Sequence, residues 1–451
     1  MPTPLLSICI PTLNRADLLE DMLFSLKAEV APLGGLVEVV VSDNASKDAT
    51  AEVLGRHQDW ITSGRNESTT GFTKNLLRVT CDLARGEFVW LVGDDDLVIR
   101  GSVARVLKSL QDHPDLDYHY LNFGWVDVLG RADIIRNMDS TPPRDPRTRF
   151  QCDELGTLRL DRLEDLALLP GRNPSALFSG IFCFAARREL FLRARPQLHP
   201  SDSLDGSSVL ADDCFPHAMI TLPVLAGRPV AYIGEPCLLQ GINAWEWGRY
   251  AYKNMLFGTH QLFTWLEATP MAKDGLAALW ASYFDMAGRL YARMLRFPAE
   301  HDGEALVREQ VLPQVAGHAP FWRAFLEEDR MIVECDHDAR TMVESLRGLV
   351  LPERARVGLW GIQGRGHRFV FFLESDRSQL VWAADREPTL HGRNLDWTQL
   401  NISSPDTLQA AELDVLALGV RREFVAEVTA HARKLLRPGA RILSVQGVET
   451  V

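Results

Sequence analysis

A short apolar run, residues 89–92, leads directly into Gly93 and three consecutive aspartates, Asp94, Asp95 and Asp96. Its β-branched and aromatic residues predict a buried strand of an open α/β sheet, where ligands bind at the carboxyl ends of strands. Three adjacent carboxylates there would repel one another unless a cation offset their charge, and oxygen ligands favour Mg²⁺ or Mn²⁺. The alternative is a solvated acidic turn in which Asp96 caps the next helix.

The size and composition of the chain limit the classes of protein it can be. Its 451 residues exceed a comfortable single core and predict two domains with connecting elements. Hydrophobic residues make up 46% and charged residues 24%, which argues against extensive disorder. The net charge of −12 and the lack of a basic stripe argue against nucleic acid as a partner.

The cysteines and the N-terminal sequence indicate the cellular compartment. Seven cysteines are an odd number and form no Cys-x-x-Cys pair, so they resemble the reduced thiols of a cytosolic protein. The N-terminus lacks the layout of a secretory signal, and no apolar run reaches the roughly 20 residues of a transmembrane helix. We therefore expect a cytoplasmic protein without a transmembrane segment, whose contact with the inner face of a membrane would be peripheral.

Strands and helices alternate through the first half of the chain, which predicts a parallel sheet wound through right-handed crossovers. Strands are expected at 5–10, 36–41, 61–67 and 89–92, with helices at 16–27, from 46–48 toward residue 54, at 73–84 and at 102–111. Further strands are expected at 117–125, 126–129, 180–185 and 230–233, a helix at 211–222 and a loop at 137–149.

The second half of the chain changes character twice. Residues 245–346 have helical periodicity with aromatic-rich faces, and strand patterns return from residue 356 onward. Strands are expected at 357–360, 380–384, 415–418 and 441–445, with helices at 367–374 and 424–435. We therefore predict an α/β domain at 1–244, a helical connector at 245–350 and a small doubly wound α/β domain at 351–451.

Four polar loops of the first domain follow predicted strands or precede helices, so they can converge on one crevice. They comprise residues 11–15, 42–46, 71–75 and 93–96. Each loop has a structural alternative: Pro11 and Asn14 can end a strand and cap a helix, and Asp43 can make only an Asx turn. The occurrence of all four in this order favours a binding site.

Three of these blocks carry a family resemblance. Residues 7–15, 41–50 and 90–96 resemble the signature blocks of glycosyltransferase family 2, whose members have the GT-A nucleotide-sugar fold. The resemblance covers about the first half of the chain. It implies transfer of a sugar from a nucleotide-diphosphate sugar to a carbohydrate or lipid-linked acceptor hydroxyl, with inversion at the anomeric carbon.

The resemblance also implies which residues bind the donor and a metal ion. A carboxylate at Asp43 would accept from a pyrimidine imide, which suits UDP or dTDP. Gly93 stands where the family has its usual first aspartate, so Asp95 is the strongest candidate ligand for Mg²⁺ or Mn²⁺. The implied nucleotide-sugar-binding residues are Pro11, Thr12, Asn14, Arg15, Asp43, Asn44, Lys74, Asn75 and Asp94, and the implied metal ligands are Asp95, Asp96 and His217.

An inverting transfer needs a carboxylate base, and residues 211–217 resemble the family's Glu-Asp motif with Asp in place of Glu. The resemblance places the base at Asp213, with Asp212 as the alternative; both could instead serve only as helix-cap residues. A lone His217 is more often structural. Trp245 and Trp247 can stack on an acceptor sugar or pack a helix. The lack of a Gln-x-x-Arg-Trp block and of membrane helices favours single transfer over polymerisation.

The predicted C-terminal domain contains Gly361, Gly364 and Gly366 after its first strand and Asp385 after its second. This pattern resembles Rossmann-like domains of sugar-modifying and methyltransferase-related proteins. It is compatible with bound nucleotide or S-adenosylmethionine, but it favours a structural role, homo-oligomer formation or acceptor positioning.

Together these features predict a metal-dependent inverting glycosyltransferase that builds a surface glycan or a glycoconjugate. Two alternatives stay open. A nucleotidyltransferase would also use acidic metal ligands, but it needs a glycine-rich, Lys- or Arg-bearing loop after the first strand, and residues 11–15 are not one. A catalytically silent nucleotide-sugar-binding or scaffolding protein would show no turnover.

Overall fold

The computed structural model describes residues 3–127, 151–170, 180–201, 210–242, 253–297, 303–352, 354–386, 390–391, 395, 398 and 400–451. The chain divides into two compact units, Met1–Phe325 and Leu326–Val451. Helix α13 (Ala319–Arg347) contains the division between them. The predicted boundaries after residues 244 and 350 stay predictions, and the first of them lies outside the described residues.

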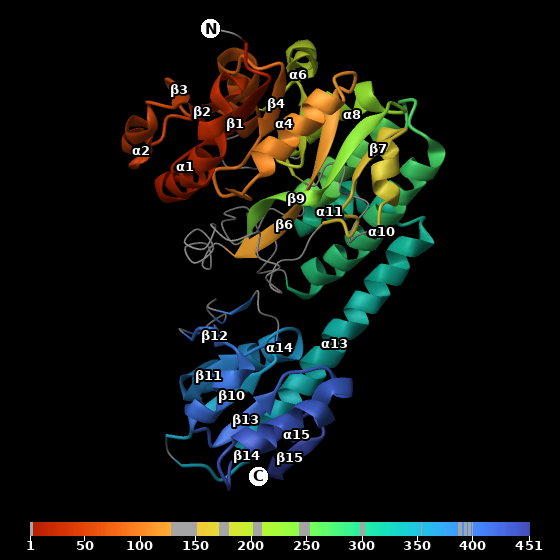
Figure 1. Cartoon of the computed structure of the whole chain (residues 1–451). Coiled ribbons are helices and arrows are strands. Elements are labelled where there is room, and N and C mark those ends of the chain that lie inside the picture. Colours follow the sequence, from red (N-terminus) through yellow and green to blue (C-terminus); the bar gives the residue numbers. More distant parts are fainter. Residues whose placement is uncertain are drawn as a thin grey trace. The chain divides into compact units, whose positions relative to one another are not determined.

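The first unit contains β1 to β9 and the helices up to the start of α13 (Figure 1). Its strands are β1 (Leu6–Thr12), β2 (Val37–Asp43), β3 (Ile61–Arg65), β4 (Phe88–Leu91), β5 (Leu97–Val98), β6 (Tyr118–Asp127), β7 (Thr157–Leu160), β8 (Phe184–Arg187) and β9 (Val230–Ile242). Its helices are α1 (Ala16–Val30), η1 (Ala31–Leu36), α2 (Thr50–His57), α3 (Phe72–Leu77), η2 (Arg78–Leu83), α4 (Ser102–Asp112), η4 (Leu163–Leu168), α6 (Arg188–Ala194), η6 (Arg195–Gln197), α7 (Ala211–Cys214), α8 (Pro216–Leu225), η8 (Lys253–Gly258), α9 (Thr259–Leu266), α10 (Lys273–Arg296), α11 (Glu304–Gln310) and α12 (Leu312–Val315).

The described strands of this unit form one sheet in the order β3-β2-β1-β4-β8-β6-β9-β5, with β7 paired to β9. Strands β3, β2, β1 and β4 are parallel, as the strand and helix alternation predicted. Parallel register places Thr12, Asp43 and Arg65 side by side at the carboxyl ends of three adjacent strands. The predicted α/β class with a GT-A type of sheet is confirmed.

The second half of this sheet departs from the parallel prediction. Strand β8 lies antiparallel between β4 and β6. Strand β9 continues beyond its predicted end at residue 233. Gly234 and Pro236 resemble the end of a strand, but they lie at a shift in the register of β9 against β6, after which the pairing resumes. The short strands β5 and β7 were not predicted.

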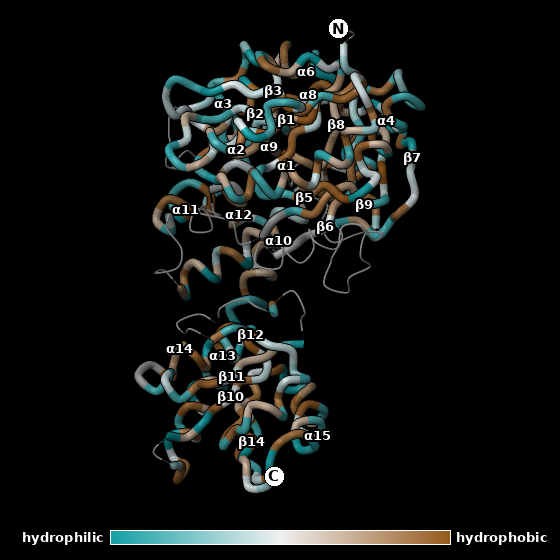
Figure 2. Tube along the Cα trace, turned by 60° about the vertical axis from the view of Figure 1, so that its left-hand side comes forward, coloured by the Kyte–Doolittle hydropathy of each residue, from teal (hydrophilic) through white to brown (hydrophobic). Residues whose placement is uncertain are grey.

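The core of the first unit follows from the apolar spacing of its elements. All seven residues of β1 are buried, and α1 buries Leu19, Met22, Leu23 and Leu26 along one face. Each such side chain contributes about 1.5–3 kcal/mol when it leaves water. Figure 2 shows that hydrophobic residues recur along the strands, whereas the connecting loops are mostly hydrophilic. The sheet is thus a fixed platform for the loops at its carboxyl edge.

The second unit has its own sheet, in the order β12-β11-β10-β13-β14-β15. All its neighbouring strands are parallel except the edge pair β14 and β15. The C-terminal part of α13 packs with α14 in one apolar cluster, and α15 packs with η11 in another. Its elements are β10 (Val357–Trp360), α14 (Arg365–Leu373), η9 (Glu374–Gln379), β11 (Leu380–Ala384), β12 (Ile402–Ser403), η11 (Pro405–Ala411), β13 (Val415–Leu418), η12 (Arg422–Phe424), α15 (Val425–Leu435), β14 (Arg441–Ser444) and β15 (Gly447–Thr450).

Within the part of the chain that the structure describes, no helix combines the length and the apolar composition that a membrane span requires.

Candidate functional site

The loops after β1 and β2 are joined to each other by hydrogen bonds. The Asn44 amide donates to the Thr12 carbonyl (2.9 Å), and the Asn14 amide donates to the Ser46 hydroxyl (2.8 Å). Asn14 has a left-handed backbone (φ 54°), which an asparagine tolerates better than most residues. Two of the four predicted loops therefore do converge. The role of Asn14 in the structure is to join the loop after β1 to the loop after β2.

Asp43 ends β2 and is fully buried. Its Oδ1 accepts from the Ser46 amide (2.9 Å), and its Oδ2 accepts from Arg65 Nη1 (2.6 Å). The Arg65 side chain is 49% exposed, so it forms the solvent side of this ion pair. Sequence reasoning missed Arg65, although its place at the end of the third parallel strand was a usable signal. A pyrimidine imide could reach Asp43 only by sharing or displacing the Arg65 contact.

Asn44 and Asn75 bind other parts of the protein. The Asn44 side chain accepts from the Thr70 amide (3.0 Å) and donates to the Thr70 carbonyl (2.7 Å). Asn75, on α3, accepts from the Ser42 hydroxyl (2.7 Å) and donates to the Ser42 carbonyl (3.1 Å). Both asparagines are 3% exposed. They fix the loop before α3 and the position of α3 itself, next to Lys74.

The acidic loop after β4 is tied to the first strand. Asp94 Oδ2 accepts from the Thr12 hydroxyl (2.7 Å), and Asp94 Oδ1 accepts from Arg15 Nη1 (3.0 Å). The same Arg15 nitrogen lies 3.5 Å from Asp95 Oδ2. Burial raises the pKa of the Asp94 carboxyl to about 6, while the Arg15 charge acts in the opposite direction. Arg15 thus bridges two of the three aspartates.

The structure explains why a glycine, Gly93, stands where the resembled family has an aspartate. A Cβ at Gly93 would lie 2.7 Å from Asp95 Oδ1 and 2.9 Å from Asp96 Oδ2. Asp96 is 1% exposed, and its Oδ2 accepts from the Gly93 amide (2.8 Å). The loop is therefore folded over Gly93 and fastened by Asp96, which leaves Asp95, with an 18% exposed side chain, best placed to meet a ligand.

A metal ion would fit this loop only if the donor completed its coordination. Among the described residues, no group of three or more His, Cys, Asp or Glu side chains could hold a metal. His217 is 2% exposed on α8 and stacks on Phe184, with ring centroids 5.9 Å apart. Mg²⁺ is commonly held by one or two carboxylates plus substrate phosphates. The donor set at Asp95 fits that mode, and the roles of Asp96 and His217 as ligands stay predictions.

The two predicted base candidates lie on the short helix α7. The Asp212 carboxylate accepts from the His199 amide (2.9 Å), and Asp213 Oδ1 accepts from the Ser201 amide (3.1 Å). The Thr73 hydroxyl of α3 donates to the Asp212 carbonyl (2.8 Å). This contact brings the third predicted loop, residues 71–75, against the segment that carries Asp213. Trp245 and Trp247, and the predicted loop at 137–149, lie outside the described residues.

The glycine-rich turn of the second unit is closed by its own backbone. A Cβ at Gly366 would lie 1.9 Å from the Gly361 carbonyl oxygen, and one at Gly419 would lie 2.2 Å from the same atom. Asp385 Oδ2 accepts from the Ile362 amide of this turn (3.0 Å), and burial raises the pKa of Asp385. Gly361 and Gly364 have positive φ values, as a tight strand-to-helix turn requires.

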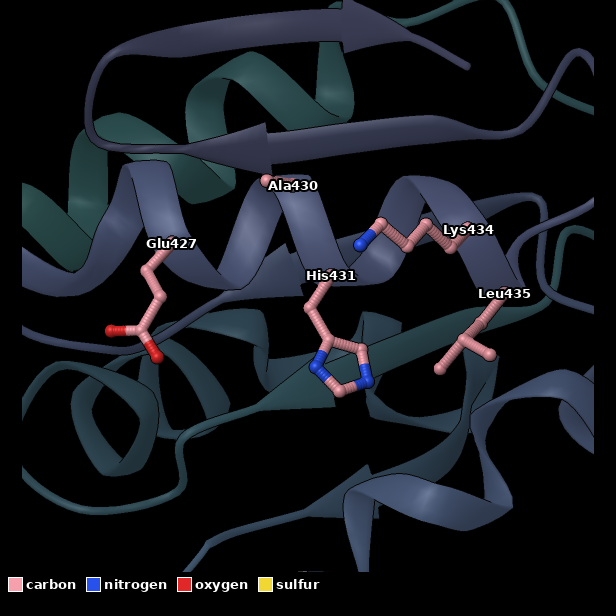
Figure 3. A pocket seen from close by; sticks show the side chains of 5 residues that line it. All are labelled: Glu427, Ala430, His431, Lys434 and Leu435. Carbon is pink, nitrogen blue, oxygen red and sulfur yellow. The ribbon is translucent and has the colours of Figure 1, made fainter.

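A pocket of about 390 Å³ lies along α15 in the second unit (Figure 3). Three of its lining residues, Glu427, His431 and Leu435, recur at four-residue spacing along the helix. The others are Ala430 and Lys434. None of them belongs to the predicted site, so this pocket adds nothing to it.

Comparisons with known proteins find a family match within the first unit. Residues 7–153 match the family model described as Glycosyl transferase family 2. This match lies in the N-terminal part of the chain and includes the loops that carry Thr12, Arg15, Asp43 and Asp95.

Two curated relatives align over 116 residues each. Abequosyltransferase RfbV of Salmonella typhimurium is 33% identical over 25% of this chain and 34% of its own length. The GalNAc(5)-diNAcBac-PP-undecaprenol beta-1,3-glucosyltransferase of Campylobacter jejuni is 28% identical over 24% of this chain and 35% of its own. The chain thus spans about a third of the length of these relatives. Among solved structures, S. aureus TarS 1–349 is 16% identical, with a TM-score of 0.43 over 88% of this chain and 98% of that one.

Proposed function

Starting from the family 2 domain at residues 7–153, we propose that the first unit is a metal-dependent inverting glycosyltransferase whose donor is a UDP- or dTDP-sugar. The observation that carries this proposal is that Arg15, Asp94 and Asp95 meet beyond the end of β4. Strand β1 alone separates β4 from β2, which ends at Asp43. These residues supply what a metal-bound nucleoside diphosphate requires. Asp43 is a buried hydrogen-bond acceptor for the base, Arg15 is a cation for the phosphates, and Asp95 is a partly exposed carboxylate for the metal.

The nucleotide would lie across the carboxyl ends of β1 and β2. Asp43 offers acceptor oxygens to the imide nitrogen of uracil or thymine, and the half-exposed Arg65 moves aside or lies over the base. Pro11 and Thr12 line the ribose side, and the Arg15 guanidinium, which is 23% exposed, turns toward the diphosphate. Lys74 adds a second positive charge next to the phosphates or the sugar.

The metal would be held by Asp95 together with oxygens of the donor diphosphate. Mg²⁺ or Mn²⁺ bound there supplies positive charge that stabilises the leaving nucleoside diphosphate. Asp94 and Asp96 support this arrangement from behind, because the first holds Arg15 and the second fastens the loop at Gly93.

Asp213 would act as the base. The acceptor hydroxyl gives its proton to the Asp213 carboxylate while its oxygen attacks the anomeric carbon, and the nucleoside diphosphate leaves from the opposite face of the sugar. Asp212 is the alternative base. The Thr73 contact supports this assignment because it brings α7 to the α3 side of the donor site.

The acceptor would be a carbohydrate or a lipid-linked glycan in the synthesis of a surface glycan or glycoconjugate. The names of the two curated relatives, an abequosyltransferase and an undecaprenol-linked glucosyltransferase, support that class of pathway. Trp245 and Trp247 stay candidates for stacking on the acceptor. The second unit would be a Rossmann-like domain, supported by the order β12-β11-β10-β13-β14, with a structural, oligomerising or acceptor-positioning role.

The proposal is tested by turnover of the full chain on a panel of sugar nucleotides with and without Mn²⁺. We expect slow hydrolysis of a UDP- or dTDP-sugar that requires the metal and is lost in Asp95→Ala. Asp213→Asn should lower kcat by roughly 10²- to 10⁴-fold. A matched control is Asp59→Asn, an exposed carboxylate paired with Lys27, which should keep full activity. No hydrolysis of any donor, or full activity of Asp213→Asn, would refute the respective assignment.

A further inference from the structure

Helix α7 is only one turn long, and its position depends on contacts with other segments. The amides of Asp213 and Cys214 donate to the Leu210 carbonyl (both 3.0 Å), which closes the turn. The Ala211 amide donates to Gln261 Oε1 on α9 (3.0 Å). A turn this short has little stability of its own, because most of its backbone groups lie at a helix end.

The carbonyl of Asp212 lacks its ordinary helical partner for a reason visible in the sequence. In a continuous helix it would accept from the amide four residues later, and that residue is Pro216, which has no N–H. The Thr73 hydroxyl donates to this carbonyl instead, at 2.8 Å. A side chain 139 residues away in sequence therefore supplies a hydrogen bond that the local sequence cannot make.

Thr73 is itself held rigidly. It lies in the first turn of α3, is fully buried, and stands two residues before Asn75, whose amide group forms two hydrogen bonds with Ser42 at the end of β2. Ser42 immediately precedes Asp43. Helix α3 is thus joined by hydrogen bonds to Ser42 of β2 through Asn75 and to the backbone beside Asp213 through Thr73.

We propose that Thr73 is a positioning residue for Asp213: its hydroxyl sets the distance between the base and the donor bound at the ends of β1 and β2. This inference rests on the proposed function, in which Asp213 takes the acceptor proton. Because a displacement of about 1 Å can cost about 100-fold in rate, one hydrogen bond at this point is enough to matter.

The test compares three variants in the full chain. Thr73→Val keeps the shape of the side chain and removes the hydroxyl, so kcat should fall about 10- to 100-fold while KM for the donor changes less than about twofold. Thr73→Ser restores the hydroxyl and should recover most of kcat. The control is Thr80→Val, since Thr80 is also fully buried in the adjoining helix η2 but donates to the Leu76 carbonyl.

Hydrogen exchange gives a readout that does not depend on turnover. The amides of Asp213 and Cys214 should exchange faster in Thr73→Val than in Thr80→Val, because the α7 turn opens more often once its anchor is lost. Equal exchange in the two variants, or equal kcat in both, would overturn the inference.

The inference and the proposed function can fail separately. If Asp213→Asn is inactive but Thr73→Val keeps full kcat, Thr73 does not position the base and the proposed function stands. If Asp213→Asn keeps full activity, the base assignment fails, and with it the proposed role of Thr73.

Discussion

The carboxyl edges of the two sheets carry similar residues in different surroundings. At the ends of β1, β2 and β4, buried carboxylates are paired with Arg15 and Arg65, whose side chains are 23% and 49% exposed. At the ends of β10, β11 and β13, Asp385 accepts from a backbone amide, and Gly366 and Gly419 lie close against the carbonyl oxygen of Gly361. At the first edge the carboxylates pair with partly exposed arginine side chains, whereas at the second edge the strand-to-helix turn closes on its own backbone and on Asp385.

This difference shows why parallel topology alone does not identify a binding site. Both edges have strand-to-helix turns and an aspartate after a strand, which are the features that suggest nucleotide binding in a sequence. At the first edge those features are joined to buried carboxylates that pair with the partly exposed Arg15 and Arg65.

Gly366→Ala should destabilise the second unit most. The added Cβ would lie 1.9 Å from the Gly361 carbonyl oxygen, and such overpacking against backbone costs roughly 3 kcal/mol or more. Hydrogen exchange of β10 to β14 measures the loss. The control is Gly55→Ala in α2, where nothing lies within 4 Å, and which should stabilise its helix by up to about 1 kcal/mol. Similar effects of both substitutions would contradict the close packing of the turn.

Acid should weaken the first unit through His119. Burial lowers the pKa of His119 to about 4, below its ordinary 6.5, so the unfolded chain binds this proton first as the pH falls. The stabilisation is complete above pH 6.5 and is lost between pH 6.5 and 4, by at most about 3 kcal/mol. Asp94, whose pKa is raised, has the opposite effect over part of this range.

The measurement is therefore the difference in unfolding free energy between the natural chain and His119→Gln, from urea titrations at several pH values. The natural chain should lose more stability than the variant on acidification. Parallel pH profiles would show that His119 is protonated equally in both states.

Arg15→Ala should weaken nucleotide binding. The guanidinium joins Asp94 and Asp95 and is proposed to contact the diphosphate of the donor. Loss of a charged hydrogen-bonding partner costs about 2 kcal/mol, or about 30-fold in Kd for UDP, measured by calorimetry. Arg56→Ala, which removes an exposed pair with Glu20, is the control and should leave Kd unchanged. Equal affinities would exclude Arg15 from the site.

Asp385→Asn should have the smallest effect. The new side chain keeps an oxygen that can accept from the Ile362 amide, so we expect less than about 1 kcal/mol in stability and no change in Kd for UDP. A large loss of nucleotide affinity in this variant would place a nucleotide in the second unit and reverse the comparison.

Much of the fold could be predicted from the sequence because apolar periodicity fixes which segments are buried. Strands β10, β11 and β13 have the predicted bounds, and α1 begins at the predicted residue. The direction of β8 could not be predicted, since strand orientation depends on a connection whose path the local sequence does not specify. The second half of β9 was not predicted because Gly234 and Pro236, which lie at its register shift against β6, resemble the end of a strand.

The candidate site could be predicted as residue types at strand ends, but not as contacts. Thr12, Arg15, Asp43 and Asp94 do lie together, as expected. The pairing of Asp43 with Arg65, and of Thr73 with the Asp212 carbonyl, joins segments 22 and 139 residues apart, and no local pattern marks such partners. Asn44 and Asn75 were predicted to bind the donor because of their residue type and position. In the structure their side chains instead bind Thr70 and Ser42 and hold the loops of the site in place.

The most direct test of the contrast between the two edges is a calorimetric titration of the full chain with UDP in the presence of Mn²⁺. We predict one nucleotide per chain, an affinity reduced at least about tenfold by Asp43→Ala, and an unchanged affinity in Asp385→Ala. Unchanged binding in Asp43→Ala, together with lost binding in Asp385→Ala, would contradict the placement of the donor at the edge of the first sheet.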